Sequence, residues 1–310
     1  MDFLILFPVF LPVLMGAAMW LVPALKKDER RLKVYVLISL IIGSLSNLAV
    51  VIAGELDFTL IKIADGMSIG FKSDELSKYF AVLMLFVWVF VGIYAFGYME
   101  HDKEKLRYFA FYVIVMGSLS GIYFSSNLVS LYLFYEMMTL VSLPLVIHTL
   151  KEKAVAAGYK YLYYSIAGAL LALLGIFFFF RYTNSLDFVA GGNLNMSAVS
   201  GNEGVILTMV LLCIIGFGCK AGMFPLHGWL PTAHPEAPAP ASAVLSGIIT
   251  KSGVIAIIRI VYYCVGADFV RGTWVQYTWM TLALVTVFLG SMMAYREKVL
   301  KKRLAYSTVS

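Results

Sequence analysis

The chain has 310 residues, of which 61% are hydrophobic and only 14% are charged; soluble globular proteins have roughly 45–50% and about 25%. Its 24 basic and 18 acidic residues are too few to cover the surface of a soluble protein of this length. The composition therefore excludes a pair of soluble domains, a disordered chain, a collagen-like chain and a small disulfide-bonded secreted domain. It indicates a polytopic membrane protein.

Nine stretches are apolar and long enough to cross a membrane as helices, which takes about 20 residues each. We therefore predict an all-α integral membrane protein with about nine transmembrane helices. The polar connection 54–76, with apolar residues and glycines interspersed, predicts a small hairpin at the membrane surface. The Asn-, Gly- and Ser-rich loop 183–203 is expected to be flexible. The predicted spans are 3–25, 34–53, 77–98, 108–124, 128–149, 158–180, 204–231, 242–265 and 274–295.

The seventh span differs from the others because its uninterrupted apolar part, 205–219, has only 15 residues. At 1.5 Å per residue this part rises about 22 Å, which is too short to cross the membrane. Lys220, Gly222 and Pro225 follow it directly. We predict a broken helix that continues over 224–230 at membrane depth, a feature at which ion sites are often built. The alternative is a shorter helix followed by an interfacial loop.

Basic residues predict the orientation, because Lys and Arg accumulate in cytoplasmic loops. Most of them follow spans 1, 3, 5 and 9, and few lie in the intervening loops. We therefore expect a multi-pass protein of the cytoplasmic membrane, with the N-terminus outside and residue 310 on the cytoplasmic side. The net charge of +6 has the same explanation and does not indicate nucleic-acid binding.

Four charged residues fall inside predicted spans, namely Glu136, Lys220, Lys251 and Arg259. Each costs roughly 2.5–3.5 kcal/mol at a helix centre, so a chain that keeps them uses or pairs them. Glu136, Lys220 and Lys251 lie near the middle of spans five, seven and eight. The alternative for each is a purely structural role. Glu136 would then be a neutral, hydrogen-bonded carboxyl group, and the lysines would extend their ammonium groups to the membrane interface. Arg259 lies nearer the outer end and is expected to anchor there or to pair locally.

Two histidines, His227 and His234, flank the predicted break. Histidine exchanges protons near neutral pH, so both are candidates for a proton path, and a structural role is the alternative. With only Glu236 near them they give a weak metal signal, and we predict no metal site. Cys213, Cys219 and Cys264 lie in apolar stretches and are expected to pack. We find no catalytic nucleophile and no cofactor motif, so we expect no catalytic centre and no cofactor in this chain.

The buried charges favour proton relay over bond-making catalysis. Burial favours the neutral form of a lysine, and a nearby carboxylate favours the charged form. A Glu136–Lys220 pair that opens and closes would therefore make the lysine release and retake a proton. Lys251 could receive it through a chain of water molecules.

Several motifs resemble the antiporter-like subunits. This family includes proton-pumping membrane subunits of respiratory complex I, membrane subunits of energy-converting hydrogenases, and large subunits of Mrp-type sodium/proton antiporters. The most specific motif is residues 212–259, LCIIGFGCKAGMFPLHGWLPTAHPEAPAPASAVLSGIITKSGVIAIIR. Residues 131–146 (LYLFYEMMTLVSLPLV), 97–112 (GYMEHDKEKLRYFAFY) and 303–310 (RLAYSTVS) match other family segments.

The resemblance implies roles for three residues. Glu136 corresponds to the family's ion-pair glutamate, Lys220 to the lysine of its broken seventh helix, and Lys251 to the relay lysine of its eighth. It further implies a three-helix flank (1–107), a first five-helix ion-translocation repeat (108–265) and the start of an incomplete second repeat (266–310). Family members have about 14 helices, so we expect a fragment, a split gene product or a second chain that supplies the rest.

Three functions remain open at this stage. The first is a proton- or sodium-translocating subunit of a redox-driven membrane complex, such as an NADH-quinone oxidoreductase-like complex or a membrane-bound hydrogenase. The second is an Mrp-type sodium/proton antiporter subunit without a redox partner, and the third is a structural scaffold subunit. All three imply other membrane subunits and the lipid bilayer as partners, and none implies nucleic acid.

Overall fold

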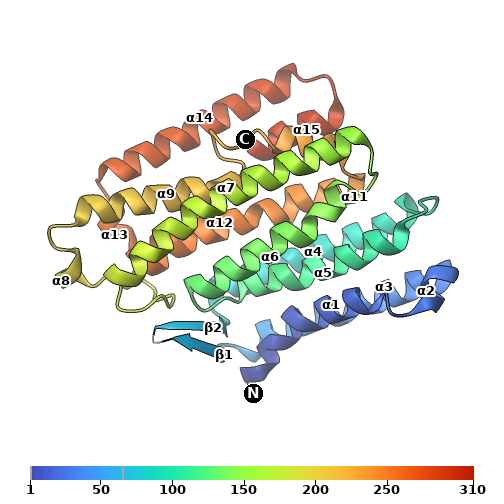
Figure 1. The fold of residues 1–310 in the computed structure, drawn as a ribbon, viewed down its shortest axis with the longest axis horizontal. Helices are drawn as coiled ribbons and strands as arrows, with labels where there is room; N and C mark the ends of the chain where they lie inside the picture. The colour runs from blue at the N-terminus through green and yellow to red at the C-terminus, as the bar shows by residue number, and fades with distance from the viewer. Residues whose placement is uncertain (1, 65) are drawn as a thin grey trace.

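The computed structural model describes residues 2–64 and 66–310 as a bundle of long helices with one β-hairpin at its edge (Figure 1). A short 3-10 helix, η1, covers Asp2–Leu6, and two segments of π-helix, η2 and η3, interrupt the eighth predicted span. The strands are β1 (Asp57–Ala64) and β2 (Met67–Lys72). The α-helices are α1 (Phe7–Ala18), α2 (Pro23–Lys27), α3 (Glu29–Ala53), α4 (Glu75–Tyr98), α5 (Lys105–Tyr123), α6 (Leu128–Val146), α7 (Glu152–Tyr182), α8 (Met196–Val199), α9 (Glu203–Ala221), α10 (Leu230–Glu236), α11 (Ala239–Val244), α12 (Thr250–Ile258), α13 (Ala267–Val270), α14 (Trp274–Arg296) and α15 (Leu300–Val309).

The prediction of an all-α membrane protein is confirmed. In the described residues, eight helical stretches are long and apolar enough to cross a membrane; one is the continuous stretch Ala239–Val265. The first predicted span, 3–25, is wrong at its end, because the helix stops at Ala18 and forms a shorter apolar segment. The reason is local: Val22 is extended because it precedes Pro23, and the residue before a proline disfavours helical backbone.

The predicted hairpin over 54–76 is confirmed, since β1 and β2 pair antiparallel with Asp57 opposite Lys72. The loop 183–203, in contrast, is held by neighbouring segments. Leu128 N donates to Leu186 O at 3.1 Å, and Phe188 N donates to Ser126 O at 2.9 Å. The side chains of Leu186 and Phe188 are buried, so apolar burial fixes a segment whose polar composition had predicted flexibility.

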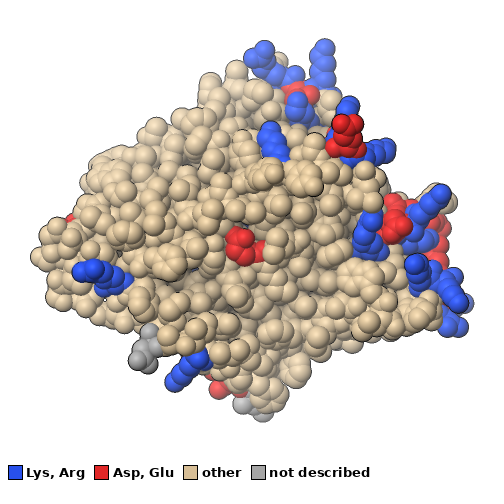
Figure 2. Space-filling model, in the orientation of Figure 1, with Lys and Arg blue, Asp and Glu red and all other residues tan. Residues whose placement is uncertain are grey.

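Charged side chains are distributed unevenly over the surface. On the face shown in Figure 2, they gather mainly at one end of the long axis, and the broad belt across the middle is almost free of charge, with one acidic side chain near its centre. The helices inside the belt differ in depth. Helix α5 packs against α1 and α6 and is buried over almost its whole length, whereas α14 lies at the edge of the bundle and buries only Val275, Thr286 and Gly290. The belt therefore has the character of a lipid-facing surface.

Helices α7 and α9 approach closely because both carry small residues where they cross. A Cβ atom at Gly216 would collide with the Gly168 carbonyl oxygen on α7. Small residues at such crossings let two membrane helices pack backbone to backbone. This crossing matters for function because α9 carries Lys220 and α7 supplies two of its partners, as described below.

We expect Gly216→Ala to lower stability by about 1–3 kcal/mol, because the helices must move apart to accept the methyl group. Thermal unfolding in detergent measures the effect. Gly204→Ala is the matched control, because an added Cβ there, in the first turn of the same helix, meets nothing within 4 Å. Equal unfolding midpoints for the two variants would contradict the close crossing.

Candidate functional site

The seventh predicted span is broken as expected. Helix α9 ends at Ala221, and Gly222 follows in the left-handed conformation (φ 86°). Residues 224–229 form turns, and helix resumes at Leu230. The helix predicted over 224–230 is therefore wrong for all but its last residue. Gly222 ends α9, and Pro225 and Pro231 disfavour helix in the residues that follow. The break is therefore longer than the sequence pattern predicts.

Protein groups satisfy the backbone that the break exposes. Phe224 N donates to Thr286 Oγ1 on α14 at 2.8 Å, and Trp229 Nε1 donates to Cys219 O at 2.9 Å. Met223 N donates to Gly218 O at 2.8 Å and closes the end of α9. Irregular backbone at membrane depth is tolerated only with partners of this kind. The break is thus a built feature of the bundle interior.

Lys220 lies in the last turn of α9, directly before the break, and its side chain is completely buried. Its ammonium group donates to Thr139 Oγ1 on α6 and to Tyr161 OH and Ser165 Oγ on α7, each at 2.9 Å. It also lies 4.4 Å from the centroid of the Tyr161 ring. Three neutral hydroxyl groups therefore use all three donors of the lysine. The C-terminal end of a helix adds a favourable dipole.

Glu136 lies one helical turn before Thr139 on α6 and is half-buried. Its Oε1 atom is buried without a hydrogen-bond partner. No ion pair joins Glu136 to Lys220 in the part of the chain that the structure describes. Glu136 therefore lies one turn from Thr139, the α6 residue that accepts a hydrogen bond from Lys220, while hydroxyl groups hold the lysine.

Lys251 is the second residue of α12, which directly follows the π-helical segment η2 (Leu245–Ile249). Its ammonium group donates to the Ser246 carbonyl oxygen at 2.9 Å, five residues earlier in the chain. Such π-segments free backbone carbonyls and are frequent at functional sites. Helix α12 packs on α9, but no hydrogen bond links Lys251 to Lys220 among the described residues. The two lysines occupy neighbouring helices without touching.

The two histidines have different surroundings. His227 lies in the turn of the break, half-buried, with its Nδ1 atom unpartnered. His234 lies in α10, almost fully buried, and its Nδ1 atom hydrogen-bonds Ser242 Oγ at 2.7 Å. His234 also lines a cavity of about 490 Å³ that reaches Ser246, the residue that holds Lys251. The structure therefore connects His234, and not His227, to the surroundings of Lys251.

Arg259 is buried and forms an ion pair. Local pairing was one of the two roles expected for it from the sequence. It forms a salt bridge with Asp74 and donates to Ser77 Oγ at 3.0 Å, at the start of α4. Its guanidinium group also lies over the rings of Phe188 and Tyr263. Burial raises the pKa of Asp74, but the hydrogen bonds and charge of Arg259 outweigh this effect and hold that pKa below its ordinary value of 3.8.

Sequence reasoning missed the partners of the buried cations. Thr139, Tyr161 and Ser165 are ordinary hydroxyl residues of apolar helices, and only the four-residue spacing of Tyr161 and Ser165 places them on one helix face. Asp74 had been assigned to a loop. Across residues 2–64 and 66–310, no group of three or more His, Cys, Asp or Glu side chains is placed to hold a metal ion.

Two family models match the chain. The model described as NADH:quinone oxidoreductase/Mrp antiporter, TM, matches residues 125–310, and NADH-Ubiquinone oxidoreductase (complex I), chain 5 N-terminus, matches residues 61–109. Hydrogenase-4 component B of Escherichia coli is 32% identical over 77% of this chain and 35% of its own length. The chloroplastic NAD(P)H-quinone oxidoreductase subunit 5 of Phaseolus vulgaris is 30% identical over 98% of this chain and 41% of its own length. The chain thus spans well under half the length of these curated relatives.

Two solved structures share the fold. A chain of the Mrp complex from Dietzia sp. aligns with a TM-score of 0.83 at 22% identity and covers all of this chain and 57% of its own length. A chain of the membrane-bound sulfane sulfur reductase, an archaeal respiratory membrane complex, aligns with a TM-score of 0.81 at 21% identity and covers 98% of this chain and 62% of its own. At these identities the likeness is one of fold.

Proposed function

Since the chain belongs to the NADH:quinone oxidoreductase/Mrp antiporter family of membrane proteins, we propose that it translocates protons as a subunit of a redox-driven membrane complex. The observation that carries the proposal is the environment of Lys220. A lysine at the break of a membrane helix is fully buried, and its hydrogen-bond partners among the described residues are neutral hydroxyl groups from two other helices. A permanent structural cation would instead need a carboxylate to offset its burial.

Hydroxyl partners suit a lysine that gains and loses a proton. Each hydroxyl can accept a hydrogen bond from the ammonium form or donate one to the neutral amine. Movement of the Glu136 carboxylate toward Lys220 would stabilise the ammonium form, and its withdrawal would favour proton release. Lys251 on the adjacent α12 is the proposed receiver. In this scheme Glu136 sets the proton affinity of Lys220, and Lys220 and Lys251 carry the proton in turn.

The cavity beside His234 is the proposed access route to Lys251. It is lined by His234, Ser242 and Ser246, and by Lys301 and Thr308 of α15. Ser246 Oγ and Thr308 Oγ1 lie 2.5 Å apart, and the Ser246 carbonyl holds Lys251. These polar groups line a cavity with room for water molecules that can bridge them. His227, with its unpartnered Nδ1 atom beside the break, is a second candidate on the path.

We propose that residues 108–265, helices α5 to η3, form the translocating unit, because they contain all five site residues. We also propose that the chain lies in the cytoplasmic membrane with residue 310 on the cytoplasmic side and the N-terminus outside, since basic residues accumulate in cytoplasmic loops. Other membrane subunits are the proposed partners. The second candidate function is sodium/proton antiport without a redox partner, which the name of the matching family model also covers.

Glu136→Gln tests the proposal. Proton uptake by vesicles that contain the complete complex should fall about tenfold or more, because a neutral amide no longer favours the ammonium form of Lys220. Glu152→Gln is the matched control, since Glu152 is exposed in the first turn of α7. Normal uptake by the Glu136 variant would exclude the relay and support the scaffold function. A dependence of uptake on a sodium gradient in the unmodified protein would support the antiporter.

A further inference from the structure

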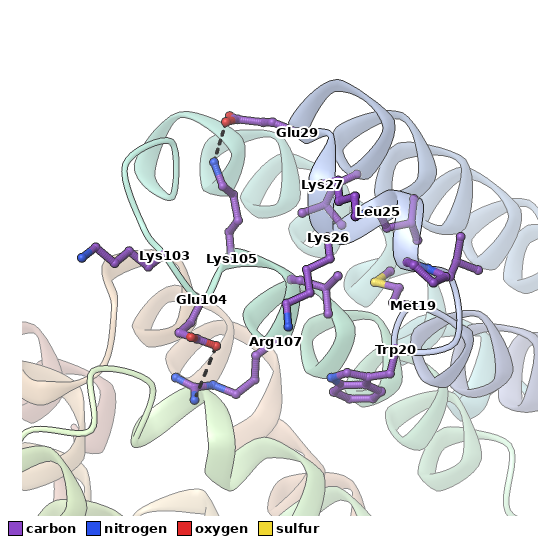
Figure 3. Close-up of a pocket in the computed structure, with 14 residues that line it drawn as sticks. Met19, Trp20, Leu25, Lys26, Lys27, Glu29, Lys103, Glu104, Lys105 and Arg107 are labelled. Carbon is purple, nitrogen blue, oxygen red and sulfur yellow. Dashed lines mark hydrogen bonds and ion pairs between the residues drawn. The ribbon is translucent and has the colours of Figure 1, made fainter.

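A cavity of about 620 Å³ opens at one end of the bundle, between α2, the start of α3 and the connection from α4 to α5 (Figure 3). Part of its wall is apolar, because Met19, Leu25 and Leu32 turn buried side chains toward it and Trp20 stands at its edge. The rest of the wall is strongly basic. It carries Lys26, Lys27, Lys103, Lys105 and Arg107.

Two of the five cations are already paired. Lys105 contacts Glu29 at 2.5 Å; Arg107 lies 3.9 Å from Glu104 and also donates to the His148 carbonyl oxygen at 2.8 Å. The side chains of Lys26, Lys27 and Lys103 have no hydrogen bond or ion pair to any of the described residues. In Figure 3 the Lys26 side chain points into the space between Trp20 and Arg107, whereas Lys103 points away from it. The cavity therefore holds an excess of positive charge beside an apolar wall.

The cavity lies beyond the end of α1, which is shorter than the neighbouring helix α3. The segment Asp2–Ala18 rises about 28 Å, whereas the 25 residues of α3 rise about 37 Å. The chain then turns and continues as the short helix α2. Trp20 packs edge-on against Phe111 at 5.2 Å and stays half-exposed. Tryptophan is enriched at the headgroup level of membranes, so the cavity lies at that level.

We propose that this cavity binds an anionic phospholipid. The phosphate group would lie against Lys26 and Arg107, and an acyl chain would cover Trp20 and the apolar wall. Basic pockets between membrane helices bind lipid headgroups of this kind. The apolar wall favours a lipid over free phosphate, because inorganic phosphate would leave it uncovered. This site is separate from Lys220 and does not depend on the proposed ion translocation.

The test is retention of phospholipid by the full chain in detergent, measured by native mass spectrometry after exchange into mixed phosphatidylglycerol and phosphatidylcholine micelles. The unmodified protein should retain phosphatidylglycerol preferentially. Lys26→Gln should reduce this preference about fivefold, and the double variant Lys26→Gln/Lys27→Gln about 25-fold, since each interfacial cation contributes a factor of this size. Lys26→Arg should restore it.

Lys298→Gln is the matched control, because Lys298 lies in a basic loop, between α14 and α15, and does not line the cavity. It should leave the preference unchanged. Equal retention of both lipids by the unmodified protein would overturn the proposal, as would an equal loss in the control. Displacement of the lipid by millimolar inorganic phosphate would also overturn it, because the site would then recognise the phosphate alone.

Discussion

Lys220→Ala is expected to reduce proton translocation at least about a hundredfold, the size of effect typical for a positioned proton-transfer group. The variant removes the cation that three hydroxyl groups on α6 and α7 hold. Proton uptake by vesicles that contain the complete complex, driven by its own electron transfer, measures the loss. Lys62→Ala is the control, because Lys62 is an exposed residue of β1 far from the bundle interior.

Lys220→Arg separates a proton carrier from a structural cation. Arginine keeps the positive charge and the hydrogen bonds but does not release its proton. We expect this variant to fold and to fail in translocation as completely as Lys220→Ala. Full activity of Lys220→Arg would show that the site needs only a charge and would contradict the relay. Electron transfer, measured in the same vesicles, should continue in both variants at the rate of the uncoupled complex.

Arg259→Met is expected to lower stability by about 3–5 kcal/mol, because it leaves the Asp74 carboxylate partly buried without its partner. The thermal midpoint in detergent should fall by on the order of 10 °C. Asp74→Asn combined with Arg259→Met should recover part of the loss, because no unpaired charge then remains. Arg271→Met is the matched control, since the Arg271–Asp268 pair is largely exposed and should contribute little.

The same pair predicts a pH dependence. The pKa of Asp74 is lower in the folded protein than its ordinary value of 3.8, although burial acts in the opposite direction. The stabilisation is therefore fully present above pH 3.8 and is lost as the pH falls through the lowered folded value. Thermal midpoints of the unmodified protein should drop in acid more steeply than those of Asp74→Asn/Arg259→Met. Parallel curves would contradict the assignment.

Sequence reasoning located the break after Lys220 because its causes are local. Gly222 and Pro225 act on their own backbone, and the short apolar run before them is visible without any partner. The end of the first helix was missed although its cause is equally local. Pro23 fixes Val22 in an extended conformation, but the surrounding residues are apolar enough to read as one continuous span.

The partners of the site could not be predicted, because hydropathy does not encode which faces of these helices meet. Lipid and protein interior are both apolar, so a membrane helix is apolar all round and its buried face has no distinct pattern. Thr139 and Tyr161 lie 81 and 59 residues from Lys220, and Asp74 lies 185 residues from Arg259. Only the packing of α6, α7 and α9 selects Thr139 and Tyr161 among many similar residues.

The amino-acid sequence alone was enough to identify the membrane class, most of the helical spans, the break, and the few charges placed at membrane depth. It could do so because the cost of burying charge and the backbone limits of glycine and proline are properties of single residues. The tertiary structure decided what each buried charge contacts. In the folded chain, hydroxyl groups surround Lys220 and the Asp74 carboxylate pairs with Arg259. Basic residues from separate loops line one cavity. These outcomes depend on contacts between distant segments, which exist only once the helices have packed.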